Sequence, residues 1–228
     1  MKKIYIASKT AILTIVLLLS VNISNADSTS VKSQLKSQND LVKNIEYVTQ
    51  SVVYIKTIEK GNSFSVASGI VINSNGYILT NSHVVSNSLN ILVTLPNNRV
   101  CLATIVKNDI INDIAIIKIN SNNLIPIKIA NSDSIRISEQ VAAVGNPLGV
   151  KKTISLGFIK DKATKLTVDQ NLTFIQSTTV TDFGSSGGAL INSKGELIGI
   201  TTASGYDNHI RCTYSIPSNL ILNLISEL

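Results

Sequence analysis

From residue 51 onward, the chain consists of short apolar runs that alternate with turn residues. Valine, isoleucine and threonine dominate these runs, and such branched side chains favour strands over helices. Asparagine, glycine, serine and proline stand between the runs, as expected for the turns that join strands. The pattern predicts twelve strands, at Val52–Ile58, Val66–Ile72, Tyr77–Thr80, Ile91–Leu95, Val100–Val106, Ile114–Ile119, Val141–Val144, Thr153–Ile159, Leu172–Ser177, Ala189–Ile191, Leu197–Thr202 and Arg211–Ile216.

These strands fall into two groups of about six, separated by a polar, loop-like stretch at residues 120–138. Within the groups, Asn73–Gly76 and Asn192–Gly195 have the composition of hairpin turns. No helical segments recur between the strands, which argues against a parallel α/β sheet. The pattern therefore predicts an all-β fold built from antiparallel sandwiches or barrels.

Two short helices are predicted outside the strands. The first rests on apolar residues at helical spacing, namely Leu41, Val42, Ile45 and Val48. The second opens at Pro217, because proline suits the first turn of a helix. Its residues available for packing are Leu220, Leu222, Ile225 and Leu228.

The N-terminal 26 residues have the composition of a secretory signal. Two lysines follow the initial methionine, residues 11–21 form an apolar run, and Ser24–Ala26 supplies small residues for cleavage. An uncleaved membrane anchor is the alternative, but the apolar run is shorter than the roughly 20 residues of a bilayer span. We therefore expect cleavage after Ala26, export to the periplasm or outside the cell, and a flexible polar segment at residues 27–40.

Composition and charge narrow the function classes. The chain has 228 residues, is 44% hydrophobic and 15% charged, and has the composition of a globular protein. Its formal charge of +6 falls to 6 − 3 = +3 without Lys2, Lys3 and Lys9 of the leader, too little to indicate nucleic-acid binding. Cys101 and Cys212 are expected to be buried thiols. An exported location would also permit a disulfide between them.

A serine among glycines, Ser186 within Gly184–Gly188, is a candidate nucleophile. Glycines allow the tight turn that exposes a hydroxyl, but a hydroxyl needs an adjacent base to take its proton. His83, at the end of a predicted strand, is the candidate base, because imidazole titrates near neutral pH. Asp113, at the head of an apolar strand, is the candidate carboxylate that would orient the histidine.

Each of these residues also has a structural interpretation. The glycine-rich segment alone could be a linker, His83 a packed or surface histidine, and Asp113 a turn or strand-capping aspartate. Asp109 is a rival acid, but it precedes the strand by several residues and suits a turn. His209 lies in a polar loop and is interpreted as a surface histidine.

Five segments carry a resemblance to a known family. They are Ala67–Ile72, Gly76–Val85, Asn112–Ala115, Gly145–Gly149 and Gly184–Gly199. Together they resemble successive blocks of the HtrA/DegP-like serine proteases, which belong to the trypsin-fold group. The candidate His, Asp and Ser follow the order of that family, with separations of 113 − 83 = 30 and 186 − 113 = 73 residues. The similarity runs from about residue 41 to residue 219, and ordered blocks are more specific than one motif.

The resemblance implies two perpendicular six-stranded β-barrels with an active-site cleft between them. The first barrel, with the N-terminal helix, would span residues 41–130, and the second, with the C-terminal helix, residues 131–228. His83 and Asp113 would come from the first barrel and Ser186 from the second.

The resemblance also implies a role for each residue. Ser186 would attack a peptide carbonyl, His83 would move the proton, and Asp113 would hold His83. The backbone N–H groups of Gly184 and Ser186 would form the oxyanion hole. No metal or cofactor is implied.

The segment before the nucleophile departs from the family pattern. Asp182 and Phe183 replace the common Asn-Pro pair, and the missing proline loosens one constraint on the loop. A resting state that substrate reorganises is therefore one expectation. Ser185 replaces the usual asparagine and is interpreted as a loop residue.

Substrate preference is expected from the positions that match the specificity pocket of trypsin-like enzymes. Val180 occupies the position of the pocket floor, and Ile200, Thr201, Thr202 and Ala203 are expected to form a wall. An apolar floor cannot pair a buried cation. The resemblance therefore predicts cleavage after small or medium aliphatic residues rather than after basic ones.

The sequence thus favours an exported serine endopeptidase that acts on unfolded or damaged polypeptides in protein quality control. Membrane contact is expected only if the signal stays uncleaved. Members of the family are often homotrimers, although no N-terminal aromatic cluster argues for a trimer here. The resemblance covers the protease domain only, and no PDZ domain is expected within these 228 residues. A non-catalytic peptide-binding protein and an esterase remain alternatives, the esterase without a G-x-S-x-G elbow.

Overall fold

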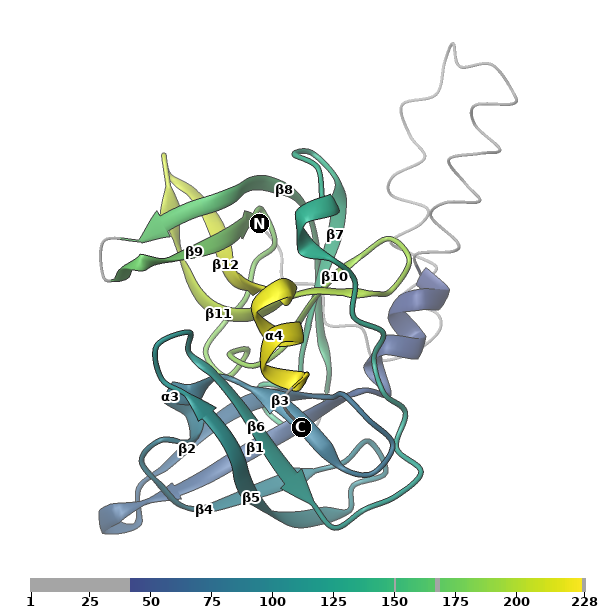
Figure 1. Cartoon of the computed structure of the whole chain (residues 1–228), viewed down its shortest axis with the longest axis vertical. Coiled ribbons are helices and arrows are strands. Elements are labelled where there is room, and N and C mark those ends of the chain that lie inside the picture. The colour runs from purple at the N-terminus through teal and green to yellow at the C-terminus, as the bar shows by residue number, and fades with distance from the viewer. Residues whose placement is uncertain (1–41, 150, 167–168, 227–228) are drawn as a thin grey trace.

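Two closed antiparallel β-barrels make up the computed structural model, which describes residues 42–149, 151–166 and 169–226 (Figure 1). The strand order is β1-β2-β3-β6-β5-β4 in the first barrel and β10-β11-β12-β9-β8-β7 in the second. The prediction of two six-stranded barrels is confirmed. The predicted signal at residues 1–26 and the polar segment at residues 27–40 lie outside the described residues.

The strands of the first barrel are β1 (Val52–Glu59), β2 (Phe64–Val71), β3 (Tyr77–Thr80), β4 (Ser88–Thr94), β5 (Val100–Asp109) and β6 (Ile114–Ile119). Those of the second are β7 (Gln140–Gly145), β8 (Thr153–Leu166), β9 (Asp169–Ser177), β10 (Ala189–Asn192), β11 (Leu197–Asp207) and β12 (Ile210–Pro217). The predicted domain division between residues 130 and 131 falls in the connection between β6 and β7.

Short helices flank or interrupt the barrels. Residues 42–49 form a helix before β1, and α4 (Ser218–Ile225) follows β12 directly after Pro217. A single turn, α3 (Ser82–Val85), follows β3, and the 3₁₀ turns are η1 (Lys60–Asn62) and η2 (Ser132–Ser134). In Figure 1, α4 lies in front of the junction between the two barrels.

The second barrel has longer strands than the apolar pattern predicted. β8 continues seven residues beyond Ile159 (166 − 159 = 7) through polar sequence, paired with β9. β11 and β12 extend to a two-residue turn in which Asn208 and His209 both have positive φ, the geometry of a type I′ hairpin. Hydrophobic patterning misses such extensions because they are held by backbone pairing at the surface rather than by burial.

Strand alternation sorts the buried side chains into three clusters. In β6, Ala115, Ile117 and Ile119 point into the first barrel, whereas Ile114 and Ile116 point out of it. This follows from the two-residue period of a strand, which sends neighbouring side chains to opposite faces. The interior of the second barrel is filled by Ile135, Val141, Ala143, Ile159, Ile175, Leu190 and Ile198.

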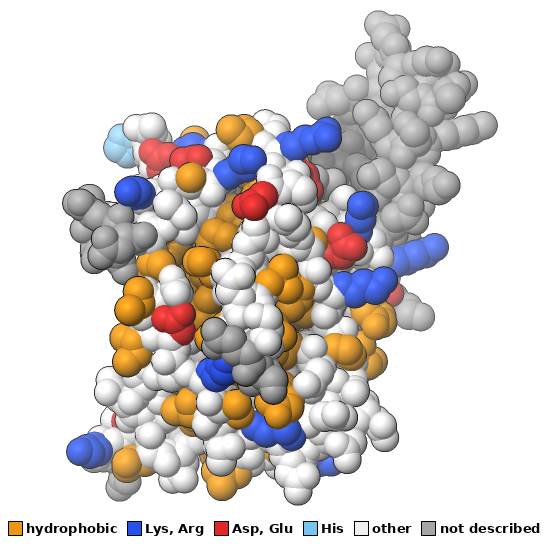
Figure 2. All heavy atoms as spheres, viewed as in Figure 1, with side chains coloured by type: hydrophobic (Ala, Val, Ile, Leu, Met, Phe, Trp, Pro, Cys, Tyr) orange, Lys and Arg blue, Asp and Glu red, His pale blue; other side chains and the backbone are white. Residues whose placement is uncertain are grey.

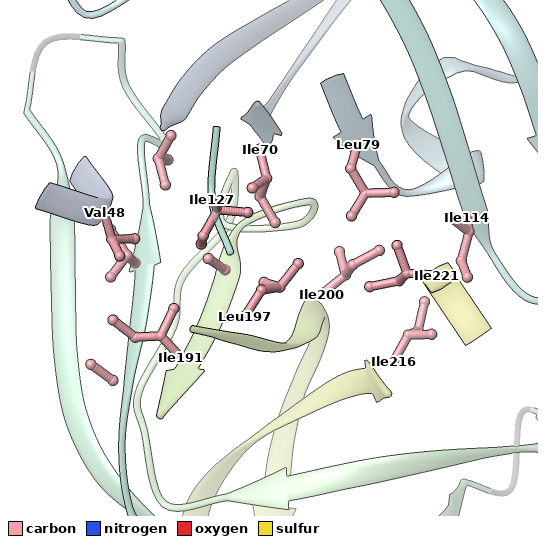
Figure 3. Close-up of a cluster of buried hydrophobic side chains, with 14 of the residues drawn as sticks. Val48, Ile70, Leu79, Ile114, Ile127, Ile191, Leu197, Ile200, Ile216 and Ile221 are labelled. Carbon is pink, nitrogen blue, oxygen red and sulfur yellow. The ribbon is translucent and has the colours of Figure 1, made fainter. Parts of the chain in front are cut away.

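The third cluster is a layer of apolar side chains between the barrels, which we call the inter-barrel layer (Figure 3). The first barrel contributes Val52, Ile70, Leu79, Ile114 and Ile116. The second barrel contributes residues of several strands, including Ile191, Leu197, Ile200 and Ile216. Ile45 and Val48 of the first helix and Ile221 of α4 complete it. The layer therefore holds the two barrels against each other.

At the surface, α4 covers part of the inter-barrel layer. In the view of Figure 1, Figure 2 shows apolar side chains on both sides of α4. Leu220, Leu224 and Ile225 of α4 are half-buried against the inter-barrel layer. No helix in the described part of the chain is both long and apolar enough to cross a bilayer.

Both cysteines carry free thiols. Cys212 is buried, as predicted, whereas Cys101 is only half-buried. Cys101 lies on β5, where many of the neighbouring side chains are exposed, so the prediction of burial was wrong for this residue.

One lysine is held at the junction of the barrels. Lys152, just before β8, donates a hydrogen bond from Nζ to the carbonyl oxygen of Val52 in β1. Burial lowers the pKa of Lys152 to about 8, because a low-dielectric environment disfavours the ammonium form. This contact therefore couples the barrel junction to proton binding.

Truncation in the inter-barrel layer should be costly. Ile116 is fully buried there, and Ile116→Ala is expected to lower the free energy of unfolding by about 2–5 kcal/mol through lost burial and an unfilled cavity. Ile111 is 77% exposed, so Ile111→Ala should change stability by less than about 0.5 kcal/mol. Urea unfolding of both variants measures this, and equal losses would contradict the assignment of the layer.

Stability should rise with pH through the titration of Lys152. Because its folded pKa is about 8 and an unfolded lysine titrates near pH 10.4, the unfolded state binds more protons between these values. The Lys152 contribution to the free energy of unfolding should therefore increase from about pH 8 to pH 10. Urea unfolding should show this rise in the wild type and in Lys151→Met, and a smaller rise in Lys152→Met. Parallel pH profiles for all three proteins would refute it.

Candidate active site

A cleft of about 500 Å³ is lined by residues of both barrels. The first barrel contributes Ser65, Val66 and Ala67 of β2 and His83 and Val84 of α3. The second contributes the segment Thr181–Ser186 before β10 and Thr201, Thr202 and Ser204 of β11. The predicted base and the predicted nucleophile therefore face the same cleft.

The imidazole of His83 is held by the carboxylate of Asp113. His83 Nδ1 lies 3.0 Å from Asp113 Oδ1 and 2.9 Å from Oδ2, and the His83 backbone N–H donates to Oδ1 at 2.9 Å. An ionised carboxylate only accepts hydrogen bonds, so Nδ1 carries the proton of the neutral ring. Nε2 is then left as an acceptor, the state that a general base requires.

Asp113 is positioned by local backbone geometry and by the second barrel. It precedes β6 with a φ of 53°, a left-handed conformation that aspartate tolerates better than most residues. The Asn81 side chain donates to its carbonyl oxygen at 3.1 Å, and Thr202 Oγ1 donates to its Oδ2 at 2.7 Å. The hydroxyl of Thr202 therefore joins the acid of one barrel to a strand of the other.

Two opposing effects act on the pKa of Asp113. Burial alone would raise it, because desolvation disfavours the charged form. The hydrogen bonds and charge of His83, together with the Thr202 hydroxyl, outweigh burial, so the pKa lies below its usual value. The carboxylate is therefore ionised at neutral pH.

The loop before the candidate nucleophile forms a defined turn. The Ser185 N–H donates to the Asp182 carbonyl oxygen at 3.0 Å, and Gly184 has a φ of 86°. A positive φ at the third residue is the mark of a type II turn. The N–H groups of Gly184 and Ser186 donate to no acceptor within the described residues. Both amides are therefore available to a ligand in the cleft.

Ser186 does not yet contact the candidate base. Its hydroxyl donates to the Thr202 carbonyl oxygen at 3.2 Å. Among the described residues, no hydrogen bond joins Ser186 to His83. The structure thus pairs His83 with Asp113 and places Ser186 across the cleft, with its hydroxyl directed to β11.

The residues predicted to form the specificity pocket are divided between cleft and core. Thr201 and Thr202 line the cleft, but Ile200 is fully buried in the inter-barrel layer. Val180 is half-buried, and its backbone N–H donates a hydrogen bond to Ser155 Oγ at 2.7 Å. Neither Val180 nor Ala203 is among the cleft-lining residues. The substrate pocket stays a prediction.

The rival residues lie elsewhere. The Asp109 carboxylate accepts hydrogen bonds from the backbone and side chain of Asn112, which is the role of a turn-forming aspartate. His209 is exposed at the tip of the β11–β12 hairpin. Within the described residues, no group of three or more His, Cys, Asp or Glu side chains is placed to hold a metal ion.

Sequence reasoning missed Ser68, a buried residue of β2. Its hydroxyl donates to the Gly184 carbonyl oxygen at 2.9 Å and accepts the Asn146 N–H at 2.9 Å. Its backbone N–H also donates to the Ser186 carbonyl oxygen at 2.8 Å. A serine within the mostly apolar run Val66–Val71 was the available signal, because a buried hydroxyl needs partners.

Asp113 should make stability depend on acid pH. Because its folded pKa is depressed, its contribution is present above the unfolded value of about 3.9 and is lost as the pH falls through the folded pKa. The stability difference between wild type and Asp113→Asn should therefore shrink below about pH 4. Urea unfolding from pH 7 to pH 2 measures it, with Asp109→Asn as the control carboxylate variant. A difference that stays constant over this range would contradict the pairing.

Comparison with known proteins places this geometry in a family. The trypsin-like peptidase domain family matches residues 67–200, more than half of the chain. The periplasmic serine endoprotease DegP of Salmonella typhimurium is 40% identical over 169 residues, which cover 72% of this chain and 36% of that protein. DegP of Escherichia coli strain K12 is 39% identical over 169 residues, with the same coverage of 72% and 36%. The chain thus spans about a third of the length of these relatives.

Solved structures show the same likeness. The HtrA-type protease AlgW with tripeptide superimposes with a TM-score of 0.75 at 30% identity, covering 82% of this chain and 62% of that one. Its fold and the family match agree with the two barrels and the cleft described above. The chain belongs to the trypsin-like peptidase family, as a homologue of the DegP and HtrA proteases.

Proposed function

We propose that the protein is an exported serine endopeptidase that hydrolyses peptide bonds of unfolded or damaged proteins. The observation that carries the proposal is that His83, whose Nδ1 lies 2.9 Å from Asp113 Oδ2, lines the same cleft as Ser186. An oriented imidazole and a serine hydroxyl are the parts that acyl transfer requires. The serine endoproteases among its homologues support the same activity.

In the proposed reaction, Ser186 Oγ attacks the carbonyl carbon of the substrate peptide while His83 Nε2 takes the hydroxyl proton. The C–N bond then breaks, and the same proton passes to the leaving amine. Water repeats the sequence on the acyl-enzyme and restores Ser186. Asp113 keeps Nδ1 protonated and stabilises the imidazolium that forms in each step.

This reaction requires one rotation. Ser186 must turn its hydroxyl from the Thr202 carbonyl oxygen to His83 Nε2, which exchanges one hydrogen bond for another. A backbone N–H of the substrate that donates to the Thr202 carbonyl oxygen would replace the Ser186 hydroxyl there. The N–H groups of Gly184 and Ser186 would then receive the oxyanion, and losing one such donor costs about 3 kcal/mol in the barrier.

The proposal also covers the substrates of the protein and its location in the cell. Polypeptides are the expected substrates, and the match of Val180 to the pocket floor of trypsin-like enzymes is the only support for aliphatic residues before the scissile bond. The homologues named as periplasmic support export across the inner membrane. The pattern of the first 26 residues supports the same location, with cleavage after Ala26.

Catalysis should depend on Ser186 and not on its neighbour. Ser186→Ala is expected to lower the hydrolysis rate of unfolded casein by at least about a thousandfold, because the nucleophile is lost. Ser185→Ala should retain most of the activity. The measurement is release of peptides over time, together with labelling by a fluorophosphonate that reacts with activated serines.

Two outcomes would change the proposal. Activity that survives Ser186→Ala but not Ser185→Ala would move the nucleophile to Ser185. No hydrolysis by the wild type, with casein still bound, would instead identify a peptide-binding protein on a protease fold. The hydrogen bond from Ser186 to Thr202 rather than to His83 is the observation that keeps this second function in view.

A further inference from the structure

Arg211 of β12 holds the segment that leads into the nucleophile loop. Its Nη2 donates to the Thr181 carbonyl oxygen at 2.7 Å and to Asp182 Oδ1 at 2.9 Å. The Asp182 carbonyl oxygen in turn accepts the Ser185 N–H that closes the turn at Gly184. Arg211 is thus linked, through Thr181 and Asp182, to the turn that positions the two candidate oxyanion-hole N–H groups.

A second residue on the same face of β12 contacts the same segment. Thr213 lies two positions after Arg211, and residues two apart on a strand share a face. Thr213 Oγ1 lies 3.0 Å from Thr181 Oγ1 and donates to the Thr179 carbonyl oxygen at 2.8 Å. The approach of Arg211 to the segment is therefore built into strand register and is not a chance contact of a long side chain.

The Arg211 charge also lies directly behind the cleft wall. Thr181 and Asp182 line the cleft, and His83 and Asp182 are the only titratable side chains among its described lining residues. The side chains of Arg211 and Asp182 are 28% and 39% exposed, so solvent screens the pair only in part. The positive charge of Arg211 balances the Asp182 carboxylate, which lines the cleft and would otherwise attract a cation.

We propose that Arg211 is a positioning and specificity-determining residue of the cleft. Its guanidinium holds Thr181 and Asp182 so that the turn at Gly184 keeps its shape. Its charge neutralises Asp182, the acid that would otherwise favour lysine or arginine at the substrate position before the scissile bond. The arginine takes over the restraint that proline supplies in related loops. This inference rests on the proposed peptidase function and adds the substrate class that the site is kept from favouring.

The test compares peptidyl 4-nitroanilides that end in valine or lysine and are otherwise identical. In Arg211→Met the lysine-to-valine ratio of kcat/KM should rise on the order of tenfold, because the charge that balances the Asp182 carboxylate in the cleft is removed. The kcat for the valine substrate should also fall severalfold. Arg211→Lys should keep the wild-type ratio but not the full kcat, since an ammonium lacks the planar fork of the guanidinium.

A matched control exists in the same barrel. Lys160 and Asp207 form an ion pair of 2.5 Å with similar exposures, 30% and 35%, and neither lines the cleft. Lys160→Met should change neither the ratio nor kcat. A ratio in Arg211→Met within twofold of wild type, or a shift as large in Lys160→Met, would overturn the inference. Arg211→Gln provides a second neutral variant if Arg211→Met does not fold.

Binding separates this inference from the proposed function. Fluorescent peptides ending in valine or lysine are titrated against the Ser186→Ala protein, with and without Arg211→Met. If the wild type hydrolyses neither nitroanilide, the peptidase proposal falls, and the ratio of peptide affinities still decides the role of the Arg211 charge. A ratio that Arg211→Met leaves unchanged, or no binding of either peptide, counts against it.

Discussion

The close approach of two backbones, at Ser68 in the first barrel and at Ser186–Gly187 in the second, is the constraint on which the candidate site depends. A Cβ atom at Gly187 would overlap the Ser68 carbonyl oxygen, and Gly187 has a φ of 80°. Only glycine meets both conditions without strain. The Ser68 N–H then donates to the Ser186 carbonyl oxygen, and the Ser68 hydroxyl donates to the Gly184 carbonyl oxygen. The nucleophile loop is therefore shaped against the other barrel and not by its own sequence alone.

Apolar burial and polar contacts have different roles at the junction between the two barrels. The inter-barrel layer supplies most of the association, because burial of apolar area is large and has no directional preference. Burial of that kind would allow the barrels to slide or rotate slightly. The contacts of Ser68, and that between the Thr202 hydroxyl and Asp113, have defined lengths and angles. These contacts therefore fix the position of His83 relative to Ser186.

Much of the fold could be predicted from the sequence because short branched-residue runs and glycine turns report strands directly. The surface extensions of β8 and β11 could not, since backbone pairing leaves no hydrophobic period. The order of His83, Asp113 and Ser186 allowed the site to be predicted as a set, and the structure brings the first two into contact. The contacts of Ser68 with Gly184, of Thr202 with Asp113 and of Arg211 with Asp182 join residues between 29 and 116 positions apart, which no local pattern encodes. The burial of Ile200 in the inter-barrel layer could not be predicted either, because an apolar residue beside a cleft can face the cleft or the core.

The division of the site between the barrels has a consequence for the order of folding. His83 and Asp113 belong to the half of the chain that is synthesised first, whereas Ser186 belongs to the half that emerges last. Neither barrel alone holds both the proposed nucleophile and the proposed base. Under the proposed function, competence for acyl transfer would therefore arise only when the two barrels dock. A partly folded chain would then be protected from copies of itself at the same stage, since none of them would carry a complete site.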